Sequence, residues 1–178
     1  FNKSLAIIER LADHDPKNST WQRDLSVSIE KVADVQNLMG DKSASLAGYE
    51  RSLVIMRRLS ESDTSNAEWR HDIAITLDQV GNLRIALRDF DGAREVLSES
   101  LDIRKQLAAA QPDNASWQVD LLIGYLDYAQ VAPDPKKVLK AGIAFGDQLK
   151  KDGRLSDNAA LMVDILSKNL LRLQKRKT

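Results

Sequence analysis

The side chains with the most chemical potential are two histidines and their neighbouring aspartates. His14 lies between Asp13 and Asp15, and His71 is followed directly by Asp72. A metal site needs convergent ligands, for example two histidines one helical turn apart, and these two histidines are far apart in the sequence. A histidine next to an aspartate in the sequence does not by itself make a catalytic dyad either. The sequence therefore predicts no metal site and no cofactor.

Carboxylate pairs are the second chemical candidate. Two carboxylates can act as the acid and base of glycoside hydrolysis, and Asp89 and Asp91 form one such pair. In a chain with 26 acidic residues, however, such pairs arise on any solvated surface. No nucleophile elbow, phosphate-binding glycine loop or dinucleotide fingerprint is present. We therefore expect no enzymatic activity.

Cations gather at the C-terminal end of the chain. They are Lys168, Arg172, Lys175, Arg176 and Lys177. They could contact phosphate or an acidic partner, but a solvated helix end explains them more simply, because cations there also suit the helix dipole. Over the whole chain the 26 basic and 26 acidic residues cancel, so we do not expect a nucleic-acid partner.

Composition narrows the class of protein further. The chain has no cysteine, which excludes a disulfide scaffold and a cysteine nucleophile. No apolar run approaches the roughly 20 residues of a membrane span, and no signal peptide is present. We expect a cytoplasmic protein. The chain lacks an initiator methionine and opens in a helical pattern formed by Phe1, Leu5 and Ile8, so we expect a fragment of a longer protein.

Three tryptophans recur at a constant interval. The spacings from Trp21 to Trp69 (69 − 21 = 48) and from Trp69 to Trp117 (117 − 69 = 48) are equal. Asparagine precedes each by three positions and aspartate follows by three. These residues are Asn18, Asn66 and Asn114, and Asp24, Asp72 and Asp120. The tryptophans could form an aromatic platform for a ligand, but a packing role is simpler and we favour it. A period of this length is typical of an array of structural repeats.

Each repeat has the apolar spacing of two helices. From Trp21 to Met39, and again from Leu46 to Leu59, apolar residues recur every three or four positions. The asparagines before the tryptophans are well placed as helix N-caps. We expect two helices of roughly 18 to 20 residues in each repeat.

The C-terminal part departs from this pattern. Residues 132–135, Ala-Pro-Asp-Pro, end the first helix of the third unit early, because proline cannot continue a helix. Ala141 and Phe145 nevertheless fall where the 48-residue register predicts them. The last segment, about 156–173, has one apolar and one charged side, as a capping helix requires.

The small residues of the repeats suggest a family. They are Ala33, Gly40-Asp41, Ser45 and Tyr49 in the first complete unit, Gly81, Arg88-Asp89-Phe90, Ala93 and Leu97 in the second, and Ala129, Ala141 and Phe145 in the third. This pattern resembles the tetratricopeptide repeat family, whose usual period is about 34 residues. The longer period resembles the long-helix subtype of bacterial multidomain proteins and kinesin light chains.

The resemblance implies an all-α, right-handed solenoid of antiparallel helix pairs with a C-terminal capping helix. Residues 1–178 would form a single domain. Its parts would be the second helix of a truncated preceding repeat (1–15), two repeats (18–63 and 66–111), a degenerate last repeat (114–152) and the capping helix (156–175).

In this family the first helix of each pair lines a concave face. By the resemblance, the residues on that face are Val27, Glu30, Asp34, Asn37, Ile75, Asp78, Asn82, Ile85, Ile123, Leu126 and Gln130. Chaperone-binding members clamp a terminal carboxylate with lysines and asparagines there. Glu30 and Asp34 stand where those cations would be needed, so we do not expect such a clamp. Glu30, Asp34 and Asp78 instead predict a mildly acidic wall over an apolar floor, suited to a basic or amphipathic peptide or helix.

Two functions remain open. The first is a protein–protein interaction module, a scaffold or sensor arm of a larger, bacterial multidomain protein. The second is a structural or self-association element, which packs against its own chain or forms a homodimer through the truncated N-terminal helix. On that second reading the groove has no external peptide ligand.

Overall fold

The structure is a computed structural model that describes residues 2–175, with side chains from Ser4 onward. All regular structure in this range is helical. The helices are α1 (Asn2–His14), α2 (Ser19–Leu38), α3 (Lys42–Ser62), α4 (Ala67–Ala86), α5 (Phe90–Ala110), α6 (Ala115–Ala129), α7 (Pro135–Lys151) and α8 (Asp157–Lys175). The predicted all-α class of helix pairs is confirmed, while the right-handed sense stays a prediction. The interpretations of Phe1, Arg176 and Lys177 concern residues outside the described range.

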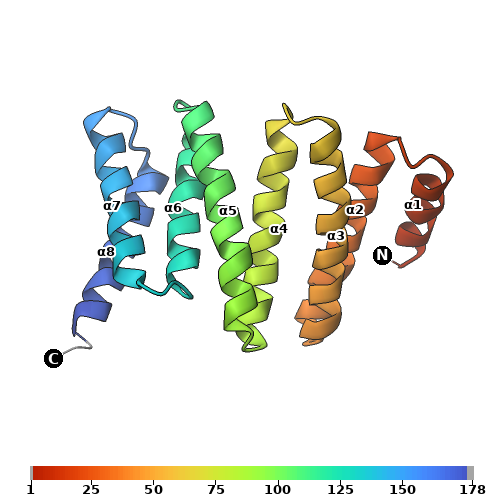
Figure 1. The fold of residues 1–178 in the computed structure, drawn as a ribbon, viewed down its shortest axis with the longest axis horizontal. Coiled ribbons are helices and arrows are strands. Elements are labelled where there is room, and N and C mark those ends of the chain that lie inside the picture. Colours follow the sequence, from red (N-terminus) through yellow and green to blue (C-terminus); the bar gives the residue numbers. More distant parts are fainter. Residues whose placement is uncertain (1, 176–178) are drawn as a thin grey trace. The chain divides into compact units, whose positions relative to one another are not determined.

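The chain divides into two compact units, residues 1–96 and 97–178. In the first unit, α1 contacts α2, α2 contacts α3 and α3 contacts α4. In the second, α7 contacts both α6 and α8, and α8 also contacts α6. Within each unit successive helices run in opposite directions (Figure 1). In the first unit each helix thus packs mainly against the helix before and the helix after it. In the second unit α6, α7 and α8 all pack against one another.

The three tryptophans occupy the same position at the start of their helices, although only Trp117 is fully buried. Each is the third residue of its helix, and its backbone N–H donates to the side chain of the asparagine N-cap. The distances are 3.1 Å to Asn18 Oδ1, 3.1 Å to Asn66 Oδ1 and 3.3 Å to Asn114 Oδ1. The predicted N-caps are therefore confirmed. The 48-residue period is first of all a repetition of helix starts, because each cap satisfies a backbone N–H that the helix itself leaves without a partner.

Small residues let α2 and α3 approach closely. Ala33 is fully buried on α2, and a Cβ built on Gly48 of α3 would lie 2.9 Å from the Cβ of Ala33. Such a contact is tighter than packed side chains tolerate, so only glycine fits at position 48 in this arrangement. Leu25 and Ile29 of α2 and Met56 of α3 complete the core of this pair. The small residue at position 33 thus has the role that the sequence predicts.

The predicted register of α7 is wrong at Ala141, whereas Phe145 is partly buried and packs against the core. Ala141 is exposed, and its neighbour Gly142 is buried in its place. A Cβ on Gly142 would lie 3.0 Å from the Cβ of Tyr125 on α6, and one on Gly146 would overlap Val163 on α8. Because α7 packs between two helices, its glycines must face them. That requirement turns the helix by one residue relative to the 48-residue register.

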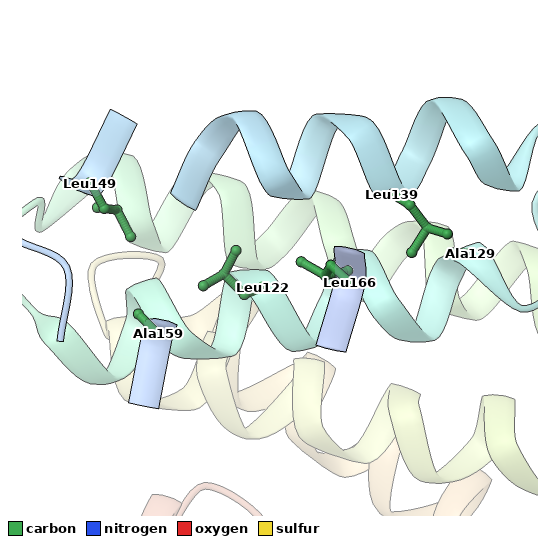
Figure 2. Packing of buried hydrophobic residues seen from close by; sticks show 6 residues of the cluster. All are labelled: Leu122, Ala129, Leu139, Leu149, Ala159 and Leu166. Atoms are coloured by element: carbon green, nitrogen blue, oxygen red, sulfur yellow. The ribbon is translucent and has the colours of Figure 1, made fainter. Parts of the chain in front are cut away.

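The core of the second unit is shared by its last three helices. Figure 2 shows six buried side chains from α6, α7 and α8, which are Leu122, Ala129, Leu139, Leu149, Ala159 and Leu166. The predicted early end of α6 is observed, since α6 ends at Ala129 and α7 begins at Pro135. Asp134 caps α7 by accepting a hydrogen bond from the backbone N–H of Lys137 at 3.0 Å.

Candidate binding surface

A shallow hollow lies between α2 and α4 in the first unit. Val27 of α2 and Ile75 of α4 occupy equivalent positions of adjacent repeats, and they are 38% and 42% exposed. Both line a hollow of about 100 Å³. Its other lining residues are Arg23, Ser26, Glu30, Met56, Asp72 and Thr76. The structure therefore brings together Val27, Glu30 and Ile75 from the predicted face, and we call this site the α2–α4 hollow.

Glu30 connects three helices. Its Oε1 atom accepts hydrogen bonds from the hydroxyl of Ser52 on α3 at 2.7 Å and from that of Thr76 on α4 at 2.8 Å. The Thr76 hydroxyl also lies 2.9 Å from the carbonyl oxygen of Asp72, one turn earlier. The second carboxylate oxygen of Glu30 receives no hydrogen bond from the described residues. Glu30 is thus an oriented carboxylate with one oxygen left for a ligand.

Asp34 is held by the second helix of its own pair. The hydroxyl of Tyr49 on α3 donates a hydrogen bond to Oδ1 of Asp34, and the Nζ of Lys31 lies 3.7 Å from Oδ2. Tyr49 is almost fully buried. This burial, and next the hydrogen bond to Asp34, raise the pKa of the Tyr49 hydroxyl above its ordinary value. The hydrogen bond directs one of the Asp34 oxygens toward α3.

The charges around the α2–α4 hollow leave it negative. Nη2 of Arg23 and Oδ2 of Asp72 form an ion pair of 3.2 Å across the two helices. Both partners are partly exposed, so the pair adds little to stability, about 0 to 1 kcal/mol. The pair neutralises the one cation among the lining residues, and the charge of Glu30 then remains. The hollow combines apolar contact area with one net negative charge.

The remaining predicted residues of the first unit differ in exposure. Asn37 and Asn82 are exposed, and Ile85 is half-buried. Asp78 is 8% exposed, so its carboxylate lies in the interior and not on the exposed acidic wall that the sequence predicts. Its neighbours one turn away on the same face of α4, Ala74 and Gly81, are buried too, so this face of the helix points into the protein. The acidic character of this surface depends on Glu30 and Asp34.

Two of the three predicted residues of α6 line another hollow. Ile123 and Leu126 are half-buried and Gln130 is exposed. Leu126 and Gln130 line a hollow of about 320 Å³ within the second unit, together with residues of α7 and α8. The sequence does not predict this arrangement, because α8 has no counterpart in the repeat.

The hydroxyl groups that orient the carboxylates were also not predicted from the sequence. Ser52 recurs in the 48-residue register with Ser4 and Ser100, but this recurrence does not indicate which residue the hydroxyl binds. In the structure Ser52 is fully buried against Glu30. Within residues 2–175, no three histidine, aspartate or glutamate side chains group as metal ligands. No helix of that range is both long and apolar enough to cross a membrane.

Comparisons with known proteins do not identify a family for this chain. No family model matches the chain, and no curated protein matches it. Among solved structures, one described as "Crystal structure of MamA" aligns with 100% of this chain and 92% of its own, at 14% identity and a TM-score of 0.31. A score this low supports no conclusion about fold or function. The assignment to tetratricopeptide repeats stays a resemblance.

Proposed function

We propose that this chain is a protein–protein interaction module, a scaffold or sensor arm of a larger, bacterial multidomain protein. In this proposal residues 18–63, 66–111 and 114–152 are its repeats, residues 156–175 its cap, and the α2–α4 hollow binds a basic or amphipathic peptide or helix. One observation carries the proposal: Val27 and Ile75 stay exposed at equivalent positions of adjacent repeats, beside the oriented carboxylate of Glu30. Apolar side chains paired in this way around a polar group are typical of a binding surface.

The geometry suggests how such a partner would bind. A lysine or arginine of the partner would form a charge-assisted hydrogen bond with the second oxygen of Glu30. An apolar side chain one helical turn away would cover Val27 and Ile75. Because Ser52 and Thr76 already fix the carboxylate, little conformational freedom is lost when the partner arrives.

Fluorescence anisotropy with labelled peptides tests the proposal. A basic amphipathic peptide should bind more tightly than its acidic counterpart, and the double variant Val27→Ser, Ile75→Ser should bind it about tenfold more weakly. Glu30→Gln should weaken binding a few-fold, because the amide oxygen can still accept from Ser52 and Thr76 while the charge is lost.

The matched control removes apolar side chains elsewhere. Leu38, the last residue of α2, and Met39, its C-cap, are 87% and 80% exposed and lie outside the α2–α4 hollow. The double variant Leu38→Ser, Met39→Ser should therefore bind like the wild type. Equal affinity of the wild type and the Val27→Ser, Ile75→Ser variant would remove this function from the α2–α4 hollow.

The alternative function is self-association through α1. Ile7 and Leu11 of α1 are exposed apolar residues, whereas Leu5 and Ile8 are half-buried. Light scattering would detect a homodimer, and Ile7→Ser with Leu11→Ser should dissociate it. A version of the chain extended N-terminally by one helix is the control. A dimer that forms only without the added helix would result from the exposed apolar face of α1 and would not indicate a biological homodimer.

A further inference from the structure

A second hollow lies within the second unit, where the loop before α7 meets the end of α8. Its volume is about 920 Å³. Its lining residues are Pro133, Asp134, Pro135, Lys136, Lys137, Lys140 and Leu173. Pro135 and Leu173 also line the 320 Å³ hollow described above, which contributes Leu126, Leu139 and Arg172. The two hollows therefore adjoin each other at these two residues, and we call them together the basic groove.

The cations of the basic groove lack partners. They are Lys136, Lys137, Lys140 and Arg172. Within the described residues none of the four forms an ion pair. The one carboxylate among the lining residues, Asp134, is engaged as the N-cap of α7. The groove is thus strongly positive in a chain whose net charge is zero.

Folding stability does not account for these lysines. Lys136, Lys137 and Lys140 lie in the first two turns of α7, and the first turn contains no acidic residue. The dipole of a helix favours negative charge at this end and disfavours cations. Asp134 already accepts a hydrogen bond from the backbone at the start of α7. The positive charge of the groove therefore comes from lysine side chains and not from backbone N–H groups. An anionic ligand would give the three lysines the partner they lack.

The lining of the groove narrows the chemistry of that ligand. Pro133, Pro135 and Leu173 provide apolar area between the cations, which a bare phosphate would leave uncovered. No aromatic side chain is among the lining residues of either hollow, so nucleobases have nothing to stack on. Carboxylates combined with bulky apolar side chains match both features.

We propose that the basic groove binds an acidic segment of a partner protein. Carboxylates of the segment pair with Lys136, Lys140 and Arg172, and a bulky apolar side chain packs on Leu173 and the two prolines. This surface shares no lining residue with the α2–α4 hollow, and its partner is acidic where the partner of that hollow is basic. A negative result for one of the two surfaces therefore does not contradict the proposal for the other.

The test uses a short fluorescein-labelled peptide in which several glutamates flank a leucine–phenylalanine pair. We expect saturable binding that weakens as salt is added, because exposed charges are screened. A peptide with serines in place of the apolar pair should bind about tenfold more weakly. A peptide with lysines in place of the glutamates should not bind to this groove.

Two double variants with the same change of charge locate the site. Lys136→Glu with Lys140→Glu should weaken binding of the acidic peptide by about tenfold or more. Lys150→Glu with Lys151→Glu, at the other end of α7, should change it by less than about twofold. Glutamate suits the start of a helix, so the first variant should melt no lower than the wild type, and circular dichroism checks this. Lost binding then cannot be attributed to unfolding.

Several results would overturn the proposal. One is equal affinity of the wild type and the Lys136→Glu, Lys140→Glu variant for the acidic peptide. Another is an oligonucleotide of similar charge that displaces the peptide and binds more tightly. A third is a homodimer, seen in sedimentation velocity without peptide, that the same double variant dissociates, because the groove would then hold a second copy of this chain.

Discussion

The two units use the same positions of the repeat in different ways. In the first unit, Met56 of α3 and Thr76 of α4 line the α2–α4 hollow. In the second unit, the positions 48 residues later are Arg104 of α5 and Gly124 of α6. Arg104 is only 4% exposed, and its Nη1 donates to the carbonyl oxygen of Asp120 at 2.8 Å. A Cβ on Gly124 would lie 3.0 Å from Cδ of Arg104, so the arginine occupies space that a larger residue would fill.

This difference shows what a repeat does and does not conserve. Helix starts and close helix contacts recur, because caps and small residues act locally. The side chains between a second helix and the first helix that follows it do not recur. Met56 and Thr76 are replaced by Arg104 and Gly124, so an arginine occupies this space in the second unit. The predictions that follow test this comparison, from the largest expected effect to the smallest.

Transferring the arginine alone should be the most destabilising change. Met56→Arg places a charge at a site that is 2% exposed and that Thr76 partly fills, so we expect a loss of about 3 kcal/mol or more in the free energy of unfolding. Adding Thr76→Gly should recover about 1 kcal/mol or more, because it opens the space and leaves the Asp72 carbonyl as an acceptor. Urea denaturation of the two single variants and the double variant gives the coupling. Additive losses would show that the two positions do not act as a pair.

The glycines of α7 separate the observed register from the one that the repeat predicts. Gly142→Val should cost about 1 to 3 kcal/mol, since its Cβ already meets Tyr125 and Leu166 at 3.0 Å. Ala141→Val adds the same side chain at an exposed position and should cost less than about 1 kcal/mol, from helix propensity alone. Thermal melts of both variants compare the two losses of stability. A larger loss for Ala141→Val would show that α7 keeps the 48-residue register.

The hydroxyl of Tyr49 should make the first unit sensitive to alkali. Since the pKa of Tyr49 is raised in the folded state, unfolding releases a proton once the pH exceeds the ordinary tyrosine value of about 10. This contribution to stability is complete below pH 10 and is lost as the pH rises through the folded pKa. Tyr49→Phe should cost about 1 kcal/mol at neutral pH and less above pH 10. Urea midpoints of the two proteins across this range test it, and parallel curves would contradict it.

The smallest expected effect concerns a buried hydroxyl. Oγ of Ser45 has no hydrogen-bond partner among the described residues, and the equivalent position of the next repeat is the fully buried Ala93. Ser45→Ala should therefore stabilise the protein by about 1 kcal/mol, because it removes an unsatisfied polar group and improves helix propensity. Ser43→Ala, exposed on the same helix, is the control and should change stability by less than about 0.5 kcal/mol. A loss of stability in Ser45→Ala would mean that the hydroxyl is satisfied after all.

Local signals made much of the fold predictable. The asparagine caps follow from residue type and position alone, and the small residue at Ala33 follows from the close approach of paired helices. The register of α7 could not be predicted, because the contact that sets it comes from Val163 and Leu166 of α8, a helix outside the repeat. The burial of Asp78 was equally hidden, since Glu30 holds the equivalent position and remains partly accessible. Exposure depends on neighbouring helices, which a periodic sequence does not specify.

The hydrogen bonds of Glu30 give one carboxylate two roles in the first unit. The carboxylate that would attract a cationic ligand is also the fastening between α2, α3 and α4. Loss of its charge would therefore weaken both the attraction for a cation and the hydrogen bonds that connect α2 to α3 and α4.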